Sequence, residues 1–514
     1  MVILTTSSGH PFAVVASDAP TEEPESAQLP DGALSSGAAK ALVFFASGAV
    51  LVLEILAGRL MAPYVGVSLE TFTSIIGTML AGIAVGATVG GRMADATSPR
   101  KLLGPTLVLG GILSWLSLPI LSIVGPGMGV DRTSIVFLTC LAFLAPATVL
   151  SAVSPMVTKL QLGSLDQTGS VVGSLSAAGT TGAIFATFFT GFVLAAALPT
   201  RPTVMALGVL LVGVGVWLWF SLNDTKPQAL GAVFALGAFG LGASSVTPCE
   251  RETAYACATV VVDEDRPSGR SLVLDDLRHS YVDLEDPTHL EFRYSHLFAD
   301  LVDPMTNGGP AGELDVLHIG GAGFAFPRYI EATRPGSTNL VLEIDGGIVE
   351  MAQEELGLVL TPELDVVIGD ARISLQDLEA DSYDLVIGDA FGGRSVPWHL
   401  TTTEVIAEIR ALMRDDGIYI MNVIDGGDSG YARAQLATLQ EHFSNVRAII
   451  PEGGVPTNRA ANLILIASNA SLPEMVVATE DGTLLDAAET SDFIDGAQVL
   501  RDDFAPVDQL AENY

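Results

Sequence analysis

Lysine is absent from the second half of this 514-residue chain, where acidic residues dominate. No lysine follows Lys226, and residues 247–514 hold 48 acids against 15 arginines. So acidic a region argues against nucleic acid or anionic lipid as its partner, because like charges repel. The excess of acid suits a cationic substrate such as a polyamine. It equally suits the acidic proteome of an organism adapted to high salt, where an acidic surface keeps proteins soluble.

Cysteine is scarce as well, with three residues in the whole chain. Cys140 lies in an apolar run and is expected to pack as an ordinary side chain. Cys249 and Cys257 follow the last apolar segment, and no CxxC or histidine-rich stretch accompanies them, so we predict no metal site. A disulfide between them is expected only if they face an oxidising compartment.

Charged residues are few between residues 39 and 246, which hold nine bases and six acids. Most of the apolar segments in this region reach the ~20 residues that a helix needs to cross a bilayer. We therefore predict a multi-pass α-helical bundle of about seven spans, embedded in the lipid of the cell membrane. Residues 1–38 hold five acids and no base, and predict a disordered acidic tail. The apolar segments are roughly 41–62, 72–94, 102–124, 134–156, 171–198, 203–221 and 228–246.

Two features of the predicted bundle suggest specific roles. Gly82, Gly86 and Gly90 have the small-xxx-small spacing that lets a second helix approach closely. Glu54 is an acid inside the first span, which makes it a candidate contact for a cationic substrate or a proton path. Alternatively, Glu54 forms an ion pair with Arg59 near the end of the same helix.

The orientation of the bundle stays open at this stage. With the amino terminus inside, six bases would lie on the inner side against three on the outer side, which modestly favours that arrangement. Seven spans would then place the carboxyl-terminal domain outside, in agreement with the cysteine pair. One span more or fewer would place that domain on the opposite side, so both sides stay open.

After the last apolar segment the pattern changes to short β segments. Residues 247–312 predict a small antiparallel lead-in domain, with strands over 255–263, 270–276 and 279–283. Residues 313–514 predict a Rossmann-like α/β domain of the methyltransferase type, because apolar strands alternate there with helix-length segments. Four of these strands end in glycine or acid, at 316–320, 340–345, 366–370 and 383–389.

The first strand ends in a glycine turn that contains Gly320, Gly321 and Gly323. Glycine allows a ligand to approach the backbone there and presents free N–H groups at the start of the next helix. Glu343 ends the following strand, where a carboxylate can accept both hydroxyls of a ribose. Together these residues predict a nucleoside site, with an adenosyl sulfonium preferred to a dinucleotide.

Two further acids end the third and fourth strands. Asp370, followed by Ala371, could read an adenine amino group, or it could cap the helix that follows. Asp389 precedes a glycine-rich loop and could accept a proton from an amine nucleophile, although a solvent-exposed turn acid remains the alternative. His296 and His399 are isolated and are expected to pack or to bond loops.

These motifs carry a family resemblance that covers most of residues 41–510. Residues 252–425 resemble the spermidine synthase (polyamine aminopropyltransferase) family, and look most like its membrane-fused major-facilitator/spermidine synthase branch. The matching stretches are Glu252–Tyr255, Leu272–Asp275, Val316–Arg328, Glu343–Asp345, Gly369–Arg372, Asp384–Phe391, Val396–Thr402 and Asp416–Gly417, with Glu54–Arg59, Ala62–Gly66 and Gly82–Asp95 in the membrane part.

The resemblance implies transfer of an aminopropyl group from decarboxylated S-adenosylmethionine to an amine such as putrescine, without a metal. It implies that Glu343 binds ribose, that Asp370 and Ala371 bind adenine, and that Pro397 lines the nucleoside pocket. Asp389 would be the catalytic proton acceptor. The residues expected to contact the amine are Tyr255, Tyr294 and Asp389.

Three positions depart from the family pattern. Each departure removes a polar side chain from the half of the site that would hold an amine. The family has an acid where this chain has Gly323, a glutamine where it has Ala256, and a second acid where it has Gly392. An ammonium buried without carboxylate partners is costly. Two other functions therefore stay open, an S-adenosylmethionine-dependent methyltransferase and a transporter or sensor that binds a nucleoside or polyamine without turnover. A homodimer is a candidate assembly.

Overall fold

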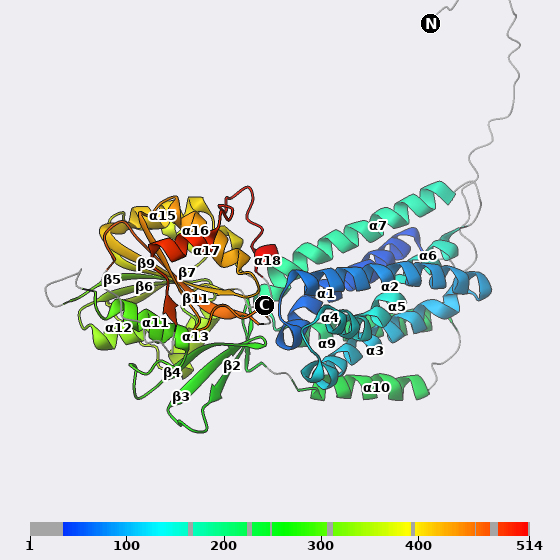
Figure 1. The fold of residues 1–514 in the computed structure, drawn as a ribbon. Helices are drawn as coiled ribbons and strands as arrows, with labels where there is room; N and C mark the ends of the chain where they lie inside the picture. The colour runs from blue at the N-terminus through cyan, green and yellow to red at the C-terminus, as the bar shows by residue number, and fades with distance from the viewer. Residues whose placement is uncertain are drawn as a thin grey trace, which may run out of the picture.

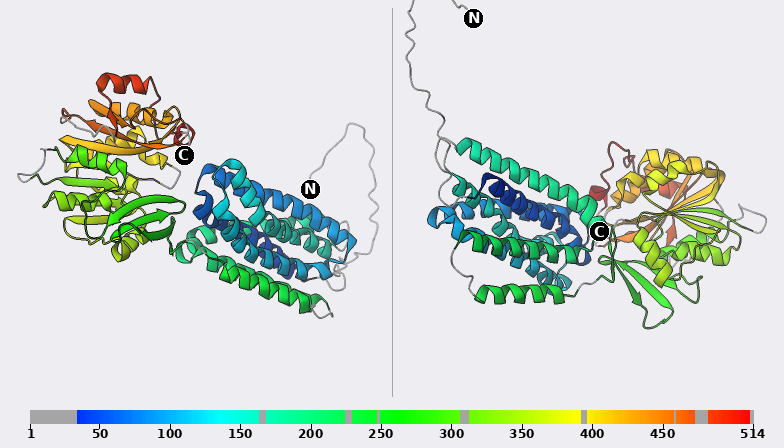
Figure 2. Two further views of the ribbon diagram at one scale, coloured as in Figure 1. Left: turned by 60° about the horizontal axis from the view of Figure 1, so that its bottom comes forward. Right: turned by 180° about the vertical axis from the view of Figure 1, so that it is seen from behind.

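A computed structural model describes residues 34–162, 168–223, 229–246, 249–305, 312–391, 396–457, 459–472 and 482–511. The chain forms a helical bundle followed by an α/β part that lies at one end of the bundle (Figures 1 and 2). The predicted acidic tail lies outside the described residues up to residue 33, and the first helix begins at Ser36.

Six helices of the described chain are long and apolar enough to cross a membrane, which confirms a multi-pass bundle. Side chains cap several of them, as where Ser68 accepts a hydrogen bond from the Thr71 N–H at 3.2 Å. The spans are α1 (Ser36–Val65), α2 (Leu69–Ala96), α3 (Pro99–Val124), α4 to α6 (Arg132–Thr139, Ala145–Ser151 and Val153–Gln161), α7 with α8 (Thr168–Phe189 and Ala195–Ala197) and α9 (Thr200–Leu222).

The seventh predicted span is the exception to the expectation of about seven full-length helices. Its described helix, α10 (Ala229–Ser244), has 16 residues and is therefore about 24 Å long, short of the ~30 Å hydrocarbon core. It nevertheless runs back along the bundle, because the Arg201 guanidinium at the start of α9 donates to the Gly242 carbonyl near the end of α10 at 2.8 Å.

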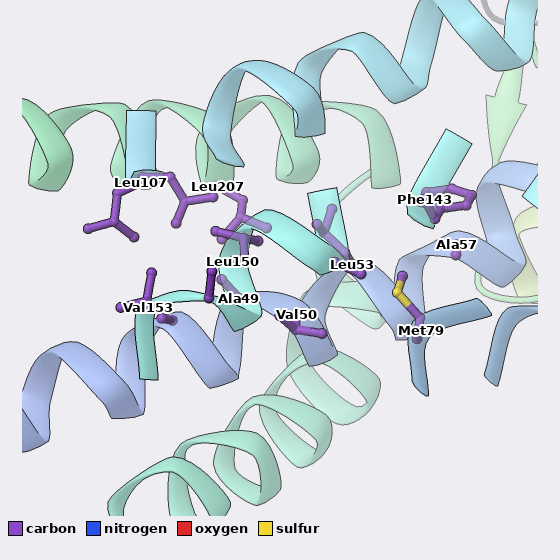
Figure 3. Packing of buried hydrophobic residues seen from close by; sticks show 14 of the residues in the cluster. Ala49, Val50, Leu53, Ala57, Met79, Leu107, Phe143, Leu150, Val153 and Leu207 are labelled. Atoms are coloured by element: carbon purple, nitrogen blue, oxygen red, sulfur yellow. The ribbon is translucent and has the colours of Figure 1, made fainter. Parts of the chain in front are cut away.

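Close helix contacts in the bundle depend on glycine, as the spacing in the second span predicts. A Cβ atom placed on Gly82 would lie 2.7 Å from the Ala147 Cβ, and one on Gly90 would collide with Ala152. Larger side chains fill the centre of the bundle, where Leu53, Leu107 and others come together from different helices (Figure 3). In lipid such packing takes the place of the hydrophobic effect as the main attraction between helices.

The predicted ion pair between Glu54 and Arg59 is wrong. Arg59 instead contacts the first strand of the soluble part, where its guanidinium lies 3.1 Å from the Glu252 carboxylate. Among the described residues Glu54 has no hydrogen-bond or ion-pair partner, so the bundle gives it no structural explanation.

The lead-in domain is a four-stranded antiparallel sheet in the order β1-β2-β3-β4. A disulfide joins Cys249 to Cys257 and so closes the turn that carries β1. The strands are β1 (Arg251–Glu252), β2 (Cys257–Val262), β3 (Gly269–Leu274) and β4 (Leu277–Asp283).

The α/β domain contains a mixed sheet in the order β12-β10-β11-β9-β8-β5-β6-β7, which confirms the predicted fold class. Strands β5 to β9 pair in parallel, and β10 to β12 pair antiparallel with their neighbours at one edge. The strands are β5 (Asp315–Ile319), β6 (Thr338–Glu343), β7 (Leu364–Ile368), β8 (Tyr383–Gly388), β9 (Met413–Asp425), β10 (Asn445–Ile450), β11 (Ala461–Ser468) and β12 (Thr483–Leu484).

Helices cover both faces of this sheet (Figure 1), so its central strands are apolar on both sides. One face carries α11 (Arg293–Val302), α12 (Ala325–Thr333) and α13 (Gly346–Glu355). The other carries α15 (Thr403–Leu412), α16 (Gly430–Gln440) and α17 (Ala487–Ile494), and the short helices α14 (Ala371–Ser374) and α18 (Val507–Leu510) complete the domain.

The close approach of α2 to its neighbour predicts the effect of adding volume at Gly86. The substitution Gly86→Val should lower the free energy of unfolding by about 1–3 kcal/mol, because its Cβ would press on Thr148 and Ser151. Gly77→Val, on the same helix, places its side chain where no atom lies within 4 Å and serves as the control. Thermal unfolding in detergent measures both, and equal stability of the two variants would contradict the packing described here.

Candidate functional site

The candidate site lies at the carboxyl ends of four adjacent parallel strands. The sheet order β8-β5-β6-β7 places Asp389, Gly320, Glu343 and Asp370 along one edge in that sequence. Strands lie ~4.8 Å apart, so Asp389 and Asp370 are separated by about 14 Å across three strand intervals. The chain order reverses between β5 and β8, and open α/β sheets bind their ligands at such a reversal.

The glycine turn after β5 is held tightly against the end of β8. Gly320 has a φ of +98°, a conformation that favours glycine, and a Cβ there would collide with the Asp389 carbonyl. The Asp389 N–H also donates to the Ile319 carbonyl at 2.9 Å. The turn therefore fixes the backbone of Asp389, which we identified as a candidate proton acceptor.

Glu343 is held by backbone N–H groups on three sides. One carboxylate oxygen accepts from the Gly321 and Ala322 N–H groups at 2.9 and 3.0 Å, and the other accepts from the Asp345 N–H at 2.9 Å. The expectation that the glycine turn presents free N–H groups to a ligand is therefore wrong for Gly321. The anion that these groups bind is the Glu343 carboxylate, which leaves no place at the turn for a pyrophosphate.

A second buried acid, Asp345, supports this carboxylate from the neighbouring loop. Asp345 is 4% exposed and caps α13 by accepting from the Gly347 N–H at 3.0 Å. The Thr253 hydroxyl of the lead-in domain donates to its other oxygen. The turn before β2 is thereby tied to the residues that surround Glu343.

Asp389 lies between two polar side chains from separate parts of the fold. The Asn422 amide of β9 donates to it at 2.8 Å, and the Tyr294 hydroxyl of α11 donates to it as well. Asn462 of β11 in turn donates to Asn422 at 2.9 Å and so orients its amide. Burial raises the pKa of Asp389 above its ordinary value, and the two hydrogen bonds partly oppose that rise.

Asp370 both caps a helix and faces a histidine, so the expected capping role is present. It accepts from the Arg372 N–H at 2.9 Å at the start of α14, and its second oxygen lies 3.2 Å from His399 Nε2. Ala371 is buried in the core beneath. Arg372 also forms an ion pair with Asp502, at 3.0 Å, and so joins this end of the site to the segment between α17 and α18.

An apolar wall lies beside Asp389, at the ends of β8 and β9. A small pocket there is lined by Pro397, Leu400 and Ile319, and it reaches the Asn422 side chain beside Asp389. Val396 and Tyr431 also line this pocket. Pro397 therefore lines a pocket, and its contact with a nucleoside stays a prediction.

The remaining predicted residues have different outcomes. Tyr294 is at the site, whereas the Tyr255 side chain is 58% exposed on the lead-in turn, where the Tyr255 N–H donates to the Thr253 hydroxyl at 3.2 Å. Gly323 faces Ser280 of β4, whose Cβ would lie 2.7 Å from a Cβ placed there. Gly392 lies outside the described residues.

Three contributing residues were not singled out from the sequence, and a fourth was expected in another role. Asn422 interrupts an otherwise apolar strand, and that buried polar position was a signal that could have been used. Asp345 and Thr253 lie in stretches that match the family pattern, Glu343–Asp345 and Glu252–Tyr255. Nothing in the sequence indicates that these two residues contact each other. His399 was expected only to bond a loop, whereas it faces Asp370.

The arrangement suits a nucleoside with a positive centre. A carboxylate held by N–H groups can still accept from ribose hydroxyls, and the two outer acids flank the space where the base and the reacting end would lie. Among the described residues no three His, Cys, Asp or Glu side chains lie together as metal ligands would.

Comparison with known proteins gives matches in the carboxyl-terminal half. No protein-family model matches the chain. A polyamine aminopropyltransferase of Vibrio vulnificus (strain CMCP6) is 22% identical over 287 residues, which span 54% of this chain and 94% of that protein. A polyamine aminopropyltransferase of Pyrobaculum neutrophilum is 30% identical over 171 residues, which span 31% of this chain and 55% of that protein.

Among solved structures, a probable spermidine synthase from Corynebacterium glutamicum is 24% identical, with a TM-score of 0.47. The match covers 51% of this chain and 99% of that one.

The contact between Gly323 and Ser280 predicts that the acid of the family pattern does not fit here. Gly323→Asp should lower the free energy of unfolding by about 1–3 kcal/mol, because its Cβ would press on the Ser280 side chain. Adding Ser280→Gly to that variant should restore much of the loss, with Ser280→Gly alone as the control. Chemical denaturation measures the four proteins, and a fully stable Gly323→Asp variant would show that strand β4 does not fill this position.

Proposed function

Because the carboxyl-terminal half of the chain is a domain of the spermidine synthase (polyamine aminopropyltransferase) family, we propose that the protein is a membrane-bound aminopropyltransferase-like enzyme. Its donor is decarboxylated S-adenosylmethionine and its acceptor is an amine such as putrescine. The observation that most supports this is Asp389, an acid with a raised pKa held at the switch point of the sheet by Tyr294 and Asn422.

In this proposal the donor lies along the strand ends. Glu343 accepts hydrogen bonds from its ribose hydroxyls, and Asp370 with Ala371 contacts its adenine. Pro397 covers the base from the apolar wall. The sulfonium and its aminopropyl chain then lie towards Asp389, on the β8 side of the edge.

The proposed reaction moves one carbon chain and one proton. The lone pair of the acceptor nitrogen attacks the aminopropyl carbon bonded to sulfur, and a C–N bond forms as the C–S bond breaks. Methylthioadenosine leaves with the electron pair of the broken bond as a neutral thioether. The proton released from the acceptor nitrogen goes to the Asp389 carboxylate, which Asn422 and Tyr294 hold in position.

An S-adenosylmethionine-dependent methyltransferase is the alternative within the same donor class. The glycine at position 323 and the alanine at position 256 favour it, since both remove polar groups that would hold a diamine. Purified protein incubated with putrescine and either labelled donor separates the two. Release of methylthioadenosine supports aminopropyl transfer, and release of S-adenosylhomocysteine supports methyl transfer. Release of neither contradicts transfer to putrescine by both routes.

Asp389→Asn should reduce turnover by about 10²- to 10⁴-fold, the usual contribution of a positioned proton acceptor. Methylthioadenosine affinity should stay within about tenfold of the wild-type value, because Glu343 and not Asp389 holds the ribose. Steady-state kinetics and calorimetric titration measure the two quantities. Wild-type turnover in this variant would remove Asp389 from the mechanism.

The raised pKa of Asp389 also predicts the pH dependence of turnover. Only the carboxylate accepts a proton, so turnover should fall as the pH drops through a pKa above that of a free aspartate. Tyr294→Phe removes a hydrogen bond that favours the carboxylate. The acidic limb of the curve of turnover against pH should therefore move to higher pH.

Tyr329→Phe removes the same hydroxyl from a Tyr–Asp pair elsewhere in the domain, where Tyr329 contacts Asp303 at 3.1 Å, and should leave the limb in place. If the acidic limb stays in place in Tyr294→Phe, the Tyr294 hydroxyl does not lower the pKa of Asp389.

A second function is nucleoside or polyamine sensing without turnover. The distribution of basic residues between the two ends of the bundle favours it. Arg59, Arg132 and Arg201 lie at the end of the bundle that faces the soluble part, whereas Lys159 and Arg100 lie at the opposite end with other bases. By the positive-inside rule this distribution favours a soluble part outside the cytoplasm, and its disulfide agrees. A cytoplasmic donor would not reach such a site unaided.

A fusion of alkaline phosphatase after residue 514 tests this sidedness, because that enzyme folds actively only outside the cytoplasm. Active phosphatase supports an external domain and the sensing function. An inactive phosphatase, with a fluorescent protein bright at the same position, supports the cytoplasmic enzyme.

A further inference from the structure

One arginine of the membrane bundle contacts a segment of the soluble part that is bonded to the candidate site. Arg59, near the carboxyl end of α1, lies 3.1 Å from the Glu252 carboxylate, and it also donates to the Thr253 carbonyl. The side chains of Arg59 and Glu252 are 21% and 18% exposed, so this ion pair is largely shielded from water. The Thr200 N–H at the start of α9 donates to Glu252 as well, at 2.8 Å.

The residue next to Glu252 continues this contact into the α/β domain. Thr253 donates its hydroxyl to Asp345, and the Asp345 N–H donates to Glu343 at 2.9 Å. A Cβ placed on Gly347 would lie 2.8 Å from the Thr253 methyl group, so the two segments are packed as well as bonded. Hydrogen bonds therefore connect Arg59 with Glu343 through two intervening residues.

The segment that carries these contacts has little freedom to move independently. Cys249 and Cys257 close it into a short covalent loop, and β1 inside that loop pairs with the start of β2. Glu252 is bonded to two different membrane helices. A displacement of α1 against α9 would therefore be passed to Thr253 instead of being absorbed by a flexible linker.

We propose that Arg59 is a positioning residue for the nucleoside site, through which the membrane bundle sets the place of Glu343. This inference rests on the proposed nucleoside binding at that site and adds the bundle as part of it. Nucleoside binding and the arrangement of the bundle are then thermodynamically linked, so each changes the other to the same extent. The bundle serves as more than an anchor.

The test measures methylthioadenosine affinity in the full-length protein by calorimetric titration, together with the melting temperature. Arg59→Ala should weaken that affinity by roughly five- to 150-fold, the usual range for coupled sites. Thr253→Val keeps the backbone carbonyl that Arg59 contacts and removes the hydroxyl that contacts Asp345, so it should weaken affinity comparably. The double variant should lose little more than either single one, because both act in one chain of contacts.

Arg132→Ala is the matched control. Arg132 lies at the same end of the bundle and forms an ion pair with Glu70 of α2 at 3.5 Å, and it should leave the affinity unchanged. Arg59→Lys should recover part of the affinity, since it keeps a cation near Glu252. A lower melting temperature with wild-type affinity in Arg59→Ala would overturn the proposal. Failure of the wild-type protein itself to bind methylthioadenosine would instead overturn the proposed function on which it rests.

Discussion

The three backbone N–H groups that hold the Glu343 carboxylate determine what this site can bind. Because Gly321 and Ala322 donate to Glu343, the turn that would cradle a pyrophosphate is already filled by a carboxylate of the protein. That arrangement fixes a carboxylate at the centre of the edge and gives the site a negative character. In the proposed function, this arrangement favours a nucleoside with a cationic sulfonium over a dinucleotide.

The second constraint comes from the membrane. Helices in lipid gain little from burying apolar surface, so the bundle depends on close glycine contacts such as those of α2, and its geometry is correspondingly definite. Arg59 carries that geometry to the soluble part through Glu252 and Thr253. A soluble domain joined in this way differs from one tethered by a flexible linker, because the bundle contributes contacts next to the candidate site.

The sequence predicts the parts of this structure that depend on local pattern. Apolar strands ending in acids specify a parallel sheet, and the carboxyl ends of neighbouring strands must share an edge, so Glu343, Asp370 and Asp389 could be placed correctly. Contacts between distant segments could not be predicted. Arg59 meets Thr253 across 194 positions, and Ser280 fills the space beside Gly323, because both depend on how the lead-in domain docks.

The most direct measurement of the central claim is nucleoside binding by a Glu343→Gln variant. An amide at this position would turn an NH₂ group towards backbone N–H donors or lose one of the carboxylate's acceptors, so both the turn and the ribose contact should suffer. The account predicts that calorimetric titration with methylthioadenosine shows binding in the wild-type protein and at least a roughly tenfold weaker affinity in a folded Glu343→Gln variant. Equal affinity in the two proteins would contradict it.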